Sequence, residues 1–526
     1  MLRKLFKSLG KSGLGVVLAL FFLALGLRLF FLFFVAGLEY CGWYHDSYHH
    51  WQIAYYTLHV GFKQDPPRMW DLSGQEYFWG LLPTLTESFL LWVFNTTSIV
   101  PFRVFNSVMG SLSVCLVYLL GKKYFDKQIG LFSALLVAFC PILWEVDTSG
   151  MLDPMGVTCL LLALFVYDRR PFTAGFFLGL ASLSHIEFWF LALGVMGCYL
   201  AFEKSGTKFV PAVLGWLVPM APYFYFLYTR TETHDPLYAL RYNCLASVVG
   251  EWLDVSLPLE AQIWPRSVAV GFLILSLTVL LYLLKRRPRA YIIHAFFWGF
   301  IAMQGVIFGL TVYIVPYLAM GQVPRLLIDR LFALNYYYIS LLTALTLRRL
   351  SIRLKSLPPR LSFRSKNLHI DYVFLLLTII VYLLSLPFVT QQYFNTIYSS
   401  PYEKQIRTAD WIALNYEGGS VISSLVIVNY RLINRGVPYA KVFGSLYSPR
   451  YYGSKNITDS YLWLKNLNAT WIIVDKNILE NFPFLKSYPA HYPPFHMENG
   501  IRPPGYEYVY HVNQTELASL SGLGKG

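Results

Sequence analysis

Long apolar stretches separated by short polar segments fill the first 390 residues of the chain. Uniformly apolar stretches of this kind are typical of membrane-spanning helices, because a helix on a soluble core is apolar on one side only. Several stretches are shorter than the roughly 20 residues of a straight span, and such helices are tolerated beside a protein-lined cavity. The pattern predicts about eleven spans, at residues 14–36, 103–121, 129–145, 154–168, 172–185, 187–203, 208–228, 264–284, 290–315, 331–347 and 370–390.

One apolar stretch does not fit this series. Residues Tyr77–Phe94 include Pro83 and Glu87, and counting them as a span would place the basic pair Lys122 and Lys123 on the wrong side. The stretch is therefore predicted to lie on the outer surface or to re-enter the bilayer partway.

The pattern changes near residue 390 to short apolar runs between polar turns. Residues Glu403–Asn415 and Ser460–Leu467 are predicted to be helices, and Ser420–Val428 and Thr470–Val474 are predicted to be buried strands. The fold class expected is an α-helical multi-span membrane protein with a small C-terminal α/β domain. The expected division is a membrane domain over residues 1–390, including an outer loop at 37–102, and an α/β domain over 391–526.

Composition supports a membrane protein and argues against a nucleic-acid partner. Hydrophobic residues make up 56% of the chain and charged residues only 14%, whereas soluble domains carry roughly 25% charged residues. The net charge of +14 comes mainly from Lys and Arg in short segments between apolar stretches, which is a topology signal and not a nucleic-acid-binding stripe.

The basic segments predict the orientation, since Lys and Arg are enriched in cytoplasmic loops. They place the N-terminus in the cytoplasm and the C-terminal domain outside, in a multi-pass protein of the cell membrane. The sequons at Asn95, Asn456, Asn468 and Asn513 all fall on the predicted outside. The cytoplasmic segments are residues 3–11, 122–127, 169–170, 204–208, 285–289 and 348–366.

The six cysteines form no metal-binding spacing and no disulfide framework. Cys115, Cys140, Cys159 and Cys198 lie in apolar stretches and are interpreted as packing residues. Cys41 and Cys244 both fall in predicted outer segments, where a disulfide between them is an alternative to two free thiols.

The first outer loop carries one candidate site. Asp46 lies among His45, His49 and His50, and helical spacing would place all four on one side. A carboxylate with neighbouring imidazoles binds a divalent cation or acts as a general base. The alternative is a helix at the membrane surface whose histidines meet lipid head groups.

A second candidate lies between the third and fourth spans. Glu145, Asp147 and Asp153 occupy this short outer loop without any Lys or Arg, and carboxylates at a membrane boundary need solvent, a partner or a metal. Such oxygen ligands suit Mg²⁺ or Mn²⁺. The alternative for Asp153 is an ordinary helix N-cap, with Pro154 at the first helical position.

Two more outer segments carry polar groups. His185 and Glu187 lie at the turn that follows a Gly-rich stretch. Arg325 and Arg330 run against the cytoplasmic bias of basic residues, and an arginine fork suits a lipid phosphate. The alternative is a surface pair of Arg330 with Asp329 or contact with lipid head groups.

The order of these segments resembles the GT-C glycosyltransferases, which use sugars linked to polyprenyl phosphate. The resemblance covers the whole chain. Within this superfamily, the chain is similar to the protein O-mannosyltransferase and lipid A aminoarabinose transferase types. The oligosaccharyltransferase branch fits less well, since the Trp-Trp-Asp motif of its soluble domain is absent. The segments that carry the resemblance are Asp46, Arg103–Leu112, Tyr118–Gly121, Gly130–Pro141, Ser149–Asp153, Gly179–His185, Arg330–Tyr338 and Leu467–Asp475.

The resemblance implies roles for individual residues. Asp46 would deprotonate the acceptor or organise a metal, and Asp153 would be the second acidic residue of the site. Arg330 would contact the phosphate of the lipid, with Tyr337 in the same motif. His185 stands where relatives often carry a basic residue, and the first loop reads His-Asp-Ser where these branches usually have an acidic pair.

The function expected is transfer of a hexosyl or pentosyl group from a polyprenyl-phosphate donor to a lipid, glycan or protein acceptor outside the cell, with membrane lipids as surroundings. The main alternative is a transporter or flippase for a lipid or polar solute. A transporter would show an internal repeat and polar groups at mid-membrane, whereas the polar groups here gather at one face. A structural membrane protein would leave the acidic outer loops unexplained.

Overall fold

The computed structural model of the protein forms two compact units. The first contains residues 1–37, 77–83 and 103–390, and the second contains 38–76, 84–102 and 391–526. Each unit is described by itself. The structure describes residues 13–39, 45–61, 79–201, 203–230, 234–241, 256–257, 323–324, 333–355, 370–384, 401–423, 425–443, 464–474, 495–497 and 508–512.

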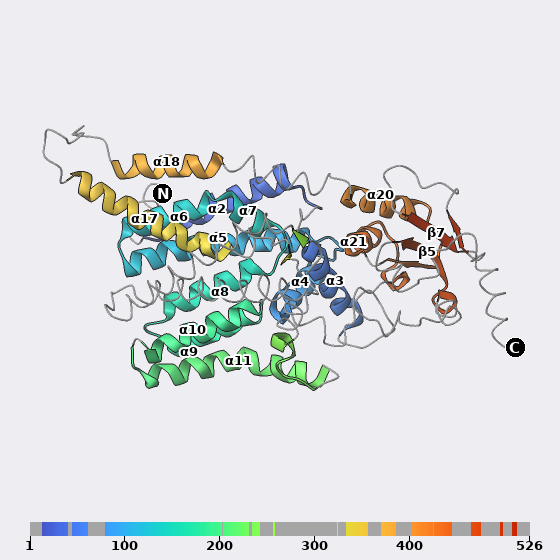
Figure 1. Cartoon of the computed structure of the whole chain (residues 1–526), viewed down its shortest axis with the longest axis horizontal. Helices are drawn as coiled ribbons and strands as arrows, with labels where there is room; N and C mark the ends of the chain where they lie inside the picture. The colour runs from blue at the N-terminus through green and yellow to red at the C-terminus, as the bar shows by residue number, and fades with distance from the viewer. Residues whose placement is uncertain are drawn as a thin grey trace, which may run out of the picture. The chain divides into compact units, whose positions relative to one another are not determined.

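The first unit is built mainly from helices (Figure 1). α2 continues directly into a π-helical turn, η1, and the two-residue strands β1 (Ser256–Leu257) and β2 (Val323–Pro324) pair antiparallel. The helices are α2 (Leu14–Phe30), η1 (Phe31–Ala36), α5 (Val100–Tyr124), α6 (Lys127–Ala138), α7 (Pro141–Thr148), α8 (Asp153–Val166), α9 (Pro171–Ser182), α10 (Glu187–Ala201), α11 (Gly206–Arg230), α17 (Ala333–Lys355) and α18 (Ile370–Leu384).

Three described helices are long and apolar enough to cross a membrane: Leu14–Ala36, Val100–Tyr124 and Gly206–Thr229. α6 and α7 pass the same criterion together, although they meet at a bend of 64°. α8, α9 and α10 are apolar but shorter, as the sequence predicted for helices beside a cavity. The predicted spans at 264–284 and 290–315 lie outside the described residues, so the total of eleven stays a prediction.

Glycines set the close approach of α9 and α11, which lie side by side in Figure 1. A Cβ added at Gly175 would lie 1.9 Å from the carbonyl oxygen of Ala212, and one at Gly215 would lie 2.0 Å from that of Phe172. Small residues are typical of membrane helix interfaces, because packing at short range replaces the hydrophobic drive of water there.

The second unit joins the first outer loop to the C-terminal residues. Within it α3 (His45–Val60) packs on α21 (Val426–Asn434), where the rings of Trp51 and Tyr430 lie 4.7 Å apart. The indole of Trp51 donates to the carbonyl of Thr97 at 2.9 Å. The sequence-based division assigned residues 37–102 to the membrane domain, but these aromatic contacts place most of the loop in the C-terminal unit.

α4 (Leu81–Val93) covers most of the apolar stretch that did not fit the series of spans. It has 13 residues, too few to cross a bilayer. The hydroxyl of Ser88 donates to the carbonyl of Ala54 on α3 at 2.7 Å. This contact holds α4 against another helix of the outer loop.

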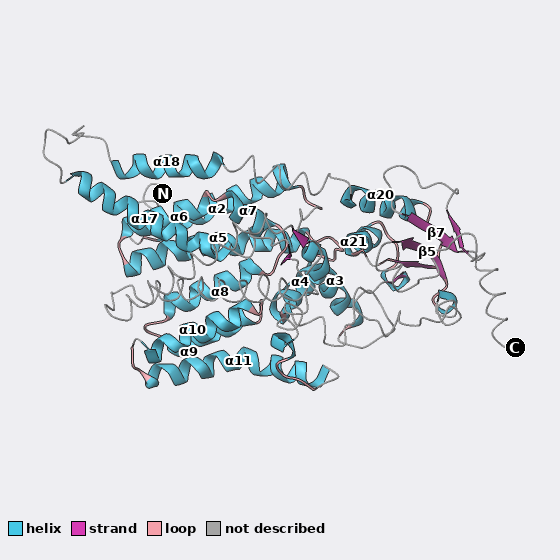
Figure 2. Ribbon diagram, viewed as in Figure 1, coloured by secondary structure: helices cyan, strands magenta, loops and turns pink. Residues whose placement is uncertain are grey.

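The C-terminal residues form a five-stranded mixed sheet with the order β4-β3-β5-β7-β6 (Figure 2). β3 runs parallel to β4 and β5, with Val421 opposite Val442 and Trp471, whereas β7 runs antiparallel to β5 and β6. The strands are β3 (Ser420–Ile422), β4 (Val442–Phe443), β5 (Ala469–Val474), β6 (Phe495–Met497) and β7 (Tyr508–Val512), and a 3₁₀ turn, η4 (Tyr439–Lys441), precedes β4.

One predicted strand is wrong in part. Residues 420–422 form β3, but residues 426–428 begin the helix α21. Nearly every side chain of α21 is buried, so its apolar residues do not show a helical stripe. The predicted helix at 403–415 is confirmed as α20 (Pro401–Leu414), and the predicted strand at 470–474 is confirmed as β5.

A charged cluster joins α20 to α21. Arg431 donates to both carboxylate oxygens of Asp410, at 2.7 and 3.1 Å, and Arg435 donates to one of them at 2.8 Å. Burial alone would raise the pKa of Asp410, but the hydrogen bonds from the two arginines outweigh it and hold this pKa below its ordinary value.

Candidate functional site

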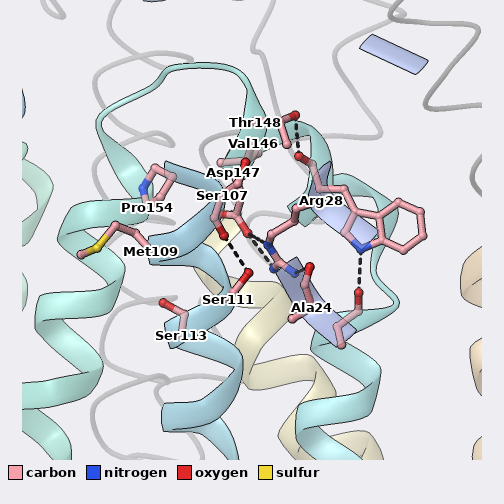
Figure 3. A network of polar contacts seen from close by, with 12 residues as sticks. Ala24, Arg28, Ser107, Met109, Ser111, Ser113, Val146, Asp147, Thr148 and Pro154 are labelled. Carbon is pink, nitrogen blue, oxygen red and sulfur yellow. Dashed lines mark hydrogen bonds and ion pairs between the residues drawn. The ribbon is translucent and has the colours of Figure 1, made fainter. Parts of the chain in front are cut away.

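A buried ion pair lies at the centre of the polar contacts in the first unit (Figure 3). The Nε and Nη2 atoms of Arg28, on α2, each lie 2.7 Å from Oδ2 of Asp147, on α7. The two side chains are 0% and 2% exposed. Arg28 also donates from Nη1 to the carbonyl of Ala24 at 3.2 Å, one turn earlier on its own helix.

The backbone of α5 packs against this ion pair at Gly110. A Cβ at Gly110 would lie 2.1 Å from Oδ2 of Asp147 and 2.8 Å from Nε of Arg28, so the absence of a side chain permits the contact. Ser107 and Ser111 project from the same helix toward the pair (Figure 3). Their hydroxyls donate to carbonyls one turn back, at 2.9 and 2.7 Å, and so are satisfied within the apolar interior.

The first part of α5 fixes the loop between α7 and α8. Nε of Arg103 donates to the carbonyl of Thr148 at 2.5 Å, and the amide of Asn106 donates to the carbonyl of Met151 at 2.7 Å. Between these two ties the chain turns at Gly150, whose φ of +82° is readily adopted only by glycine. A side chain of α5 therefore holds each end of this turn.

Asp153 follows the fixed loop and is the first residue of α8. Its carboxylate is partly exposed and close enough to Asp147 for the two charges to interact. The N-cap position of α8 is Leu152, whose side chain makes no capping hydrogen bond, so Asp153 lies one residue inside the helix. Pro154 does occupy the first turn, as predicted.

Tyr337, on α17, is 3% exposed and belongs to the same region. Its hydroxyl is within hydrogen-bonding reach of Ser113 and within electrostatic reach of Arg28 and Asp147. Tyr337 also lines an apolar cavity, together with Val117, Leu120, Gly121, Leu161, Leu164 and Leu341.

His185 is buried at the turn between α9 and α10, and Glu187 begins α10. The ring of His185 stacks on Trp79 with 6.0 Å between centroids. The first turn of α4 is bound to this turn, since the backbone N–H of Leu82 donates to the carbonyl of Leu183 at 3.0 Å. A Cβ at Gly80 would lie 2.5 Å from the carbonyl oxygen of Ser184, which explains the glycine there.

Asp46 and His49 belong to the second unit, in the first turns of α3. Asp46 is partly buried, and His49 is 6% exposed with its ring stacked on His50 at 5.7 Å. Joint action of Asp46 with Asp147 or Asp153 stays a prediction. Arg325 and Arg330 lie outside the described residues.

Within each of the two units, the described residues bring no three His, Cys, Asp or Glu side chains close enough to bind one ion. Asp147 offers one oxygen to two nitrogens of Arg28, and a cation of the protein itself thus takes the place expected for a metal. These donors do not fit a metal at Asp147. The predicted ligands Asp46, His49 and Asp153 stay a prediction.

The sequence analysis missed Arg28, Arg103 and Gly110. Arg28 was read as part of the apolar span 14–36, although a charged side chain inside a span is by itself a signal of a partner or a functional site. Arg103 and Asn106 were noted within a motif but not as ties to the acidic loop. Their role depends on the backbone position of residues 148–151, which no local pattern encodes.

Comparison with known proteins identifies the fold. Residues 82–228 match the family model described as dolichyl-phosphate-mannose-protein mannosyltransferase. A comparison with curated proteins finds no significant match. The matched residues 82–228 contain α5, α7 and α8, which build the site around Asp147 and Asp153.

Solved structures are similar over nearly the whole chain. ArnT from Cupriavidus metallidurans in the apo state has a TM-score of 0.55 at 12% identity, covering 97% of this chain and 99% of its own. The oligosaccharyltransferase AglB from Archaeoglobus fulgidus, in complex with an inhibitory peptide and a dolichol-phosphate, has a TM-score of 0.52 at 15% identity, with coverages of 90% and 70%. The A. fulgidus enzyme with Zn and sulfate has 0.52 at 14%, with coverages of 95% and 73%.

These matches confirm the resemblance to the GT-C membrane glycosyltransferases. At 12–15% identity the solved structures establish the fold and not the sugar, the acceptor or the site residues.

Proposed function

We propose that this chain is a membrane glycosyltransferase that transfers a sugar from a polyprenyl-phosphate donor to an acceptor on the extracytoplasmic side. The observation that carries the proposal is the family match over residues 82–228, because this stretch contains the acidic loop and the helix that fixes it. The dolichol-phosphate bound to AglB supports a lipid phosphate as the donor. The inhibitory peptide bound to AglB supports a polypeptide as one of the acceptors to be tested.

The proposed chemistry needs a base and a stabilised leaving group. A carboxylate, Asp46 or Asp153, takes the proton of the acceptor hydroxyl as the sugar is transferred. Arg325 and Arg330 bind the departing lipid phosphate, whose negative charge an arginine fork matches. The acceptor is a lipid, a glycan or a protein.

The test is sugar transfer by the purified chain from radiolabelled polyprenyl-phosphate hexose or pentose. We expect Asp46→Asn and Asp153→Asn each to reduce the rate by about 100-fold or more, the usual contribution of a positioned acid or base. Asp168→Asn is the matched control, since Asp168 is 40% exposed and pairs with Lys123 at the predicted cytoplasmic end.

Full activity in both Asp46→Asn and Asp153→Asn would contradict the assignment of the base. No transfer by the wild type from any donor, together with saturable solute uptake into vesicles that contain the chain, would replace the proposal with a transporter.

A further inference from the structure

The two aspartates of the second outer loop have very different surroundings. Asp147 is 2% exposed and bound to Arg28, whereas Asp153 is partly exposed at the start of α8. We propose that Asp147 is neither a metal ligand nor a catalytic residue, and that its ion pair with Arg28 is a positioning device for Asp153. This inference rests on the proposed function only where it concerns catalysis.

The geometry of the pair leaves no position for a metal on the shared oxygen. Two nitrogens of Arg28 lie 2.7 Å from Oδ2 of Asp147, and the backbone of α5 closes over the same oxygen at Gly110. A divalent ion such as Mg²⁺ needs the oxygen at about 2.0–2.1 Å and several further ligands around it. The guanidinium would have to leave first, and it would then be a buried cation without a partner.

The pair is one of three ties that hold the loop in front of Asp153. Asp147 is bound to α2 through Arg28, and the next residue, Thr148, is bound to α5 through Arg103. Met151 is bound to α5 through Asn106. Because the three ties span residues 147–151 and Asp153 follows two residues later, a shift of α7 would move Asp153 with it. A displacement of about 1 Å is enough to slow a reaction that depends on near-attack geometry.

The pair also explains why an arginine is retained in an otherwise apolar helix. A single buried charge is strongly unfavourable, whereas replacing both partners with apolar residues of similar volume is often neutral for stability. Loss of one partner should therefore lower the stability of the protein, whereas loss of both should leave it nearly unchanged. A catalytic or metal-binding aspartate would not behave in this way, because the second substitution would not restore it.

The first experiment is a double-mutant cycle on thermal unfolding in detergent. We expect Arg28→Met and Asp147→Leu each to lower the unfolding temperature, and the double variant to regain most of the loss. Gly110→Ala should lower it too, because its Cβ has no room beside the pair. Gly26→Ala is the matched control. Gly26 lies on α2, the helix that carries Arg28, and a Cβ there meets nothing within 4 Å.

The second experiment compares the two aspartates in transfer and in metal binding. In the double variant we expect kcat to fall while KM for the lipid donor is unchanged, and Mn²⁺ binding measured by electron paramagnetic resonance to equal that of the wild type. Asp153→Asn should reduce transfer by about 100-fold or more without lowering the unfolding temperature.

The inference is overturned if the loss of unfolding temperature in the double variant equals the sum of the two single losses. It is also overturned if the folded double variant binds Mn²⁺ more weakly than the wild type. Failure of the proposed function is a separate outcome. It would appear as absence of transfer by the wild type, and the unfolding cycle would remain readable because it needs no activity.

Discussion

At the scale of single residues, Glu87 contrasts with Asp147. Both carboxyl groups are buried, but Asp147 has an arginine partner, whereas the two carboxyl oxygens of Glu87 accept no hydrogen bond from the described residues. Glu87 is 1% exposed on α4, outside the predicted spans. Burial disfavours its charged form and raises its pKa well above the ordinary value of 4.5.

The raised pKa of Glu87 gives the stability of the protein a pH dependence. The folded state holds the proton to a higher pH than the unfolded state, so the free energy of unfolding decreases as pH rises from about 4.3 through the folded pKa. We expect Glu87→Gln to remove this loss. Its advantage in unfolding temperature over the wild type should be small near pH 4 and should grow toward neutral pH.

Thermal unfolding in detergent between pH 4 and 8 measures this difference. Glu417→Gln, which removes an exposed carboxyl, is the control. An offset between wild type and Glu87→Gln that is the same at every pH would mean that Glu87 does not titrate in this range.

At the scale of elements, the sequence predicted most of what an apolar pattern encodes. The positions of α2, α5, α8, α9 and α11 follow from runs of apolar residues, since each run must find either lipid or a neighbouring helix. α21 was assigned in part to a strand, because a short run that is buried on all sides has no period to distinguish helix from strand.

The sequence predicted only those parts of the candidate site that the type and position of a single residue indicate. Asp147 and Asp153 stand out as acids in an outer loop, and Tyr337 lies in a motif. The pairing of Arg28 with Asp147 joins residues 119 positions apart, and its geometry depends on Gly110 of a third helix. Such a three-helix contact has no local sequence pattern. The sequence analysis therefore expected a divalent cation at Asp147, where the structure has the guanidinium of Arg28.

The packing of α9 on α11 provides a test at this scale. Gly175→Ala should lower the unfolding temperature by several degrees, because the added Cβ would lie 1.9 Å from a backbone oxygen that no side-chain rotation can move away. Gly194→Ala, on α10, is the matched control because a Cβ there meets nothing within 4 Å. It should be neutral or slightly stabilising, since alanine favours helix more than glycine does.

Equal unfolding temperatures for Gly175→Ala and Gly194→Ala in the same detergent would show that the two helices separate without loss. The interface would then contribute little to the fold of the first unit.

At the scale of the whole molecule, the orientation in the membrane is the property on which the proposed chemistry depends. The basic residues predict that residues 204–208, which include the end of the turn after α10 and the start of α11, are cytoplasmic and that the C-terminal residues are outside. With this orientation, the loop that carries Asp147 and Asp153 opens outside.

Reporter fusions test this orientation. We expect a fluorescent protein fused after residue 205 to fluoresce and alkaline phosphatase at the same position to be inactive, because the first folds in the cytoplasm and the second is active outside. The two reporters should exchange behaviour when they are fused after residue 526. The same behaviour at both positions would contradict an odd number of spans between them.

The composition of the second unit also has a consequence for biosynthesis. Glu39 accepts a hydrogen bond from Tyr430, a residue made 391 positions later. At about 5–20 residues per second, a ribosome needs roughly 20–80 seconds to synthesise that interval. During this time Tyr48 and Trp51 of α3 lack their contact with the ring of Tyr430, which has not yet been synthesised. A nonsense mutation before residue 430 would therefore leave Tyr48 and Trp51 without the ring that packs on them, and we expect the truncated chain to be degraded by proteases.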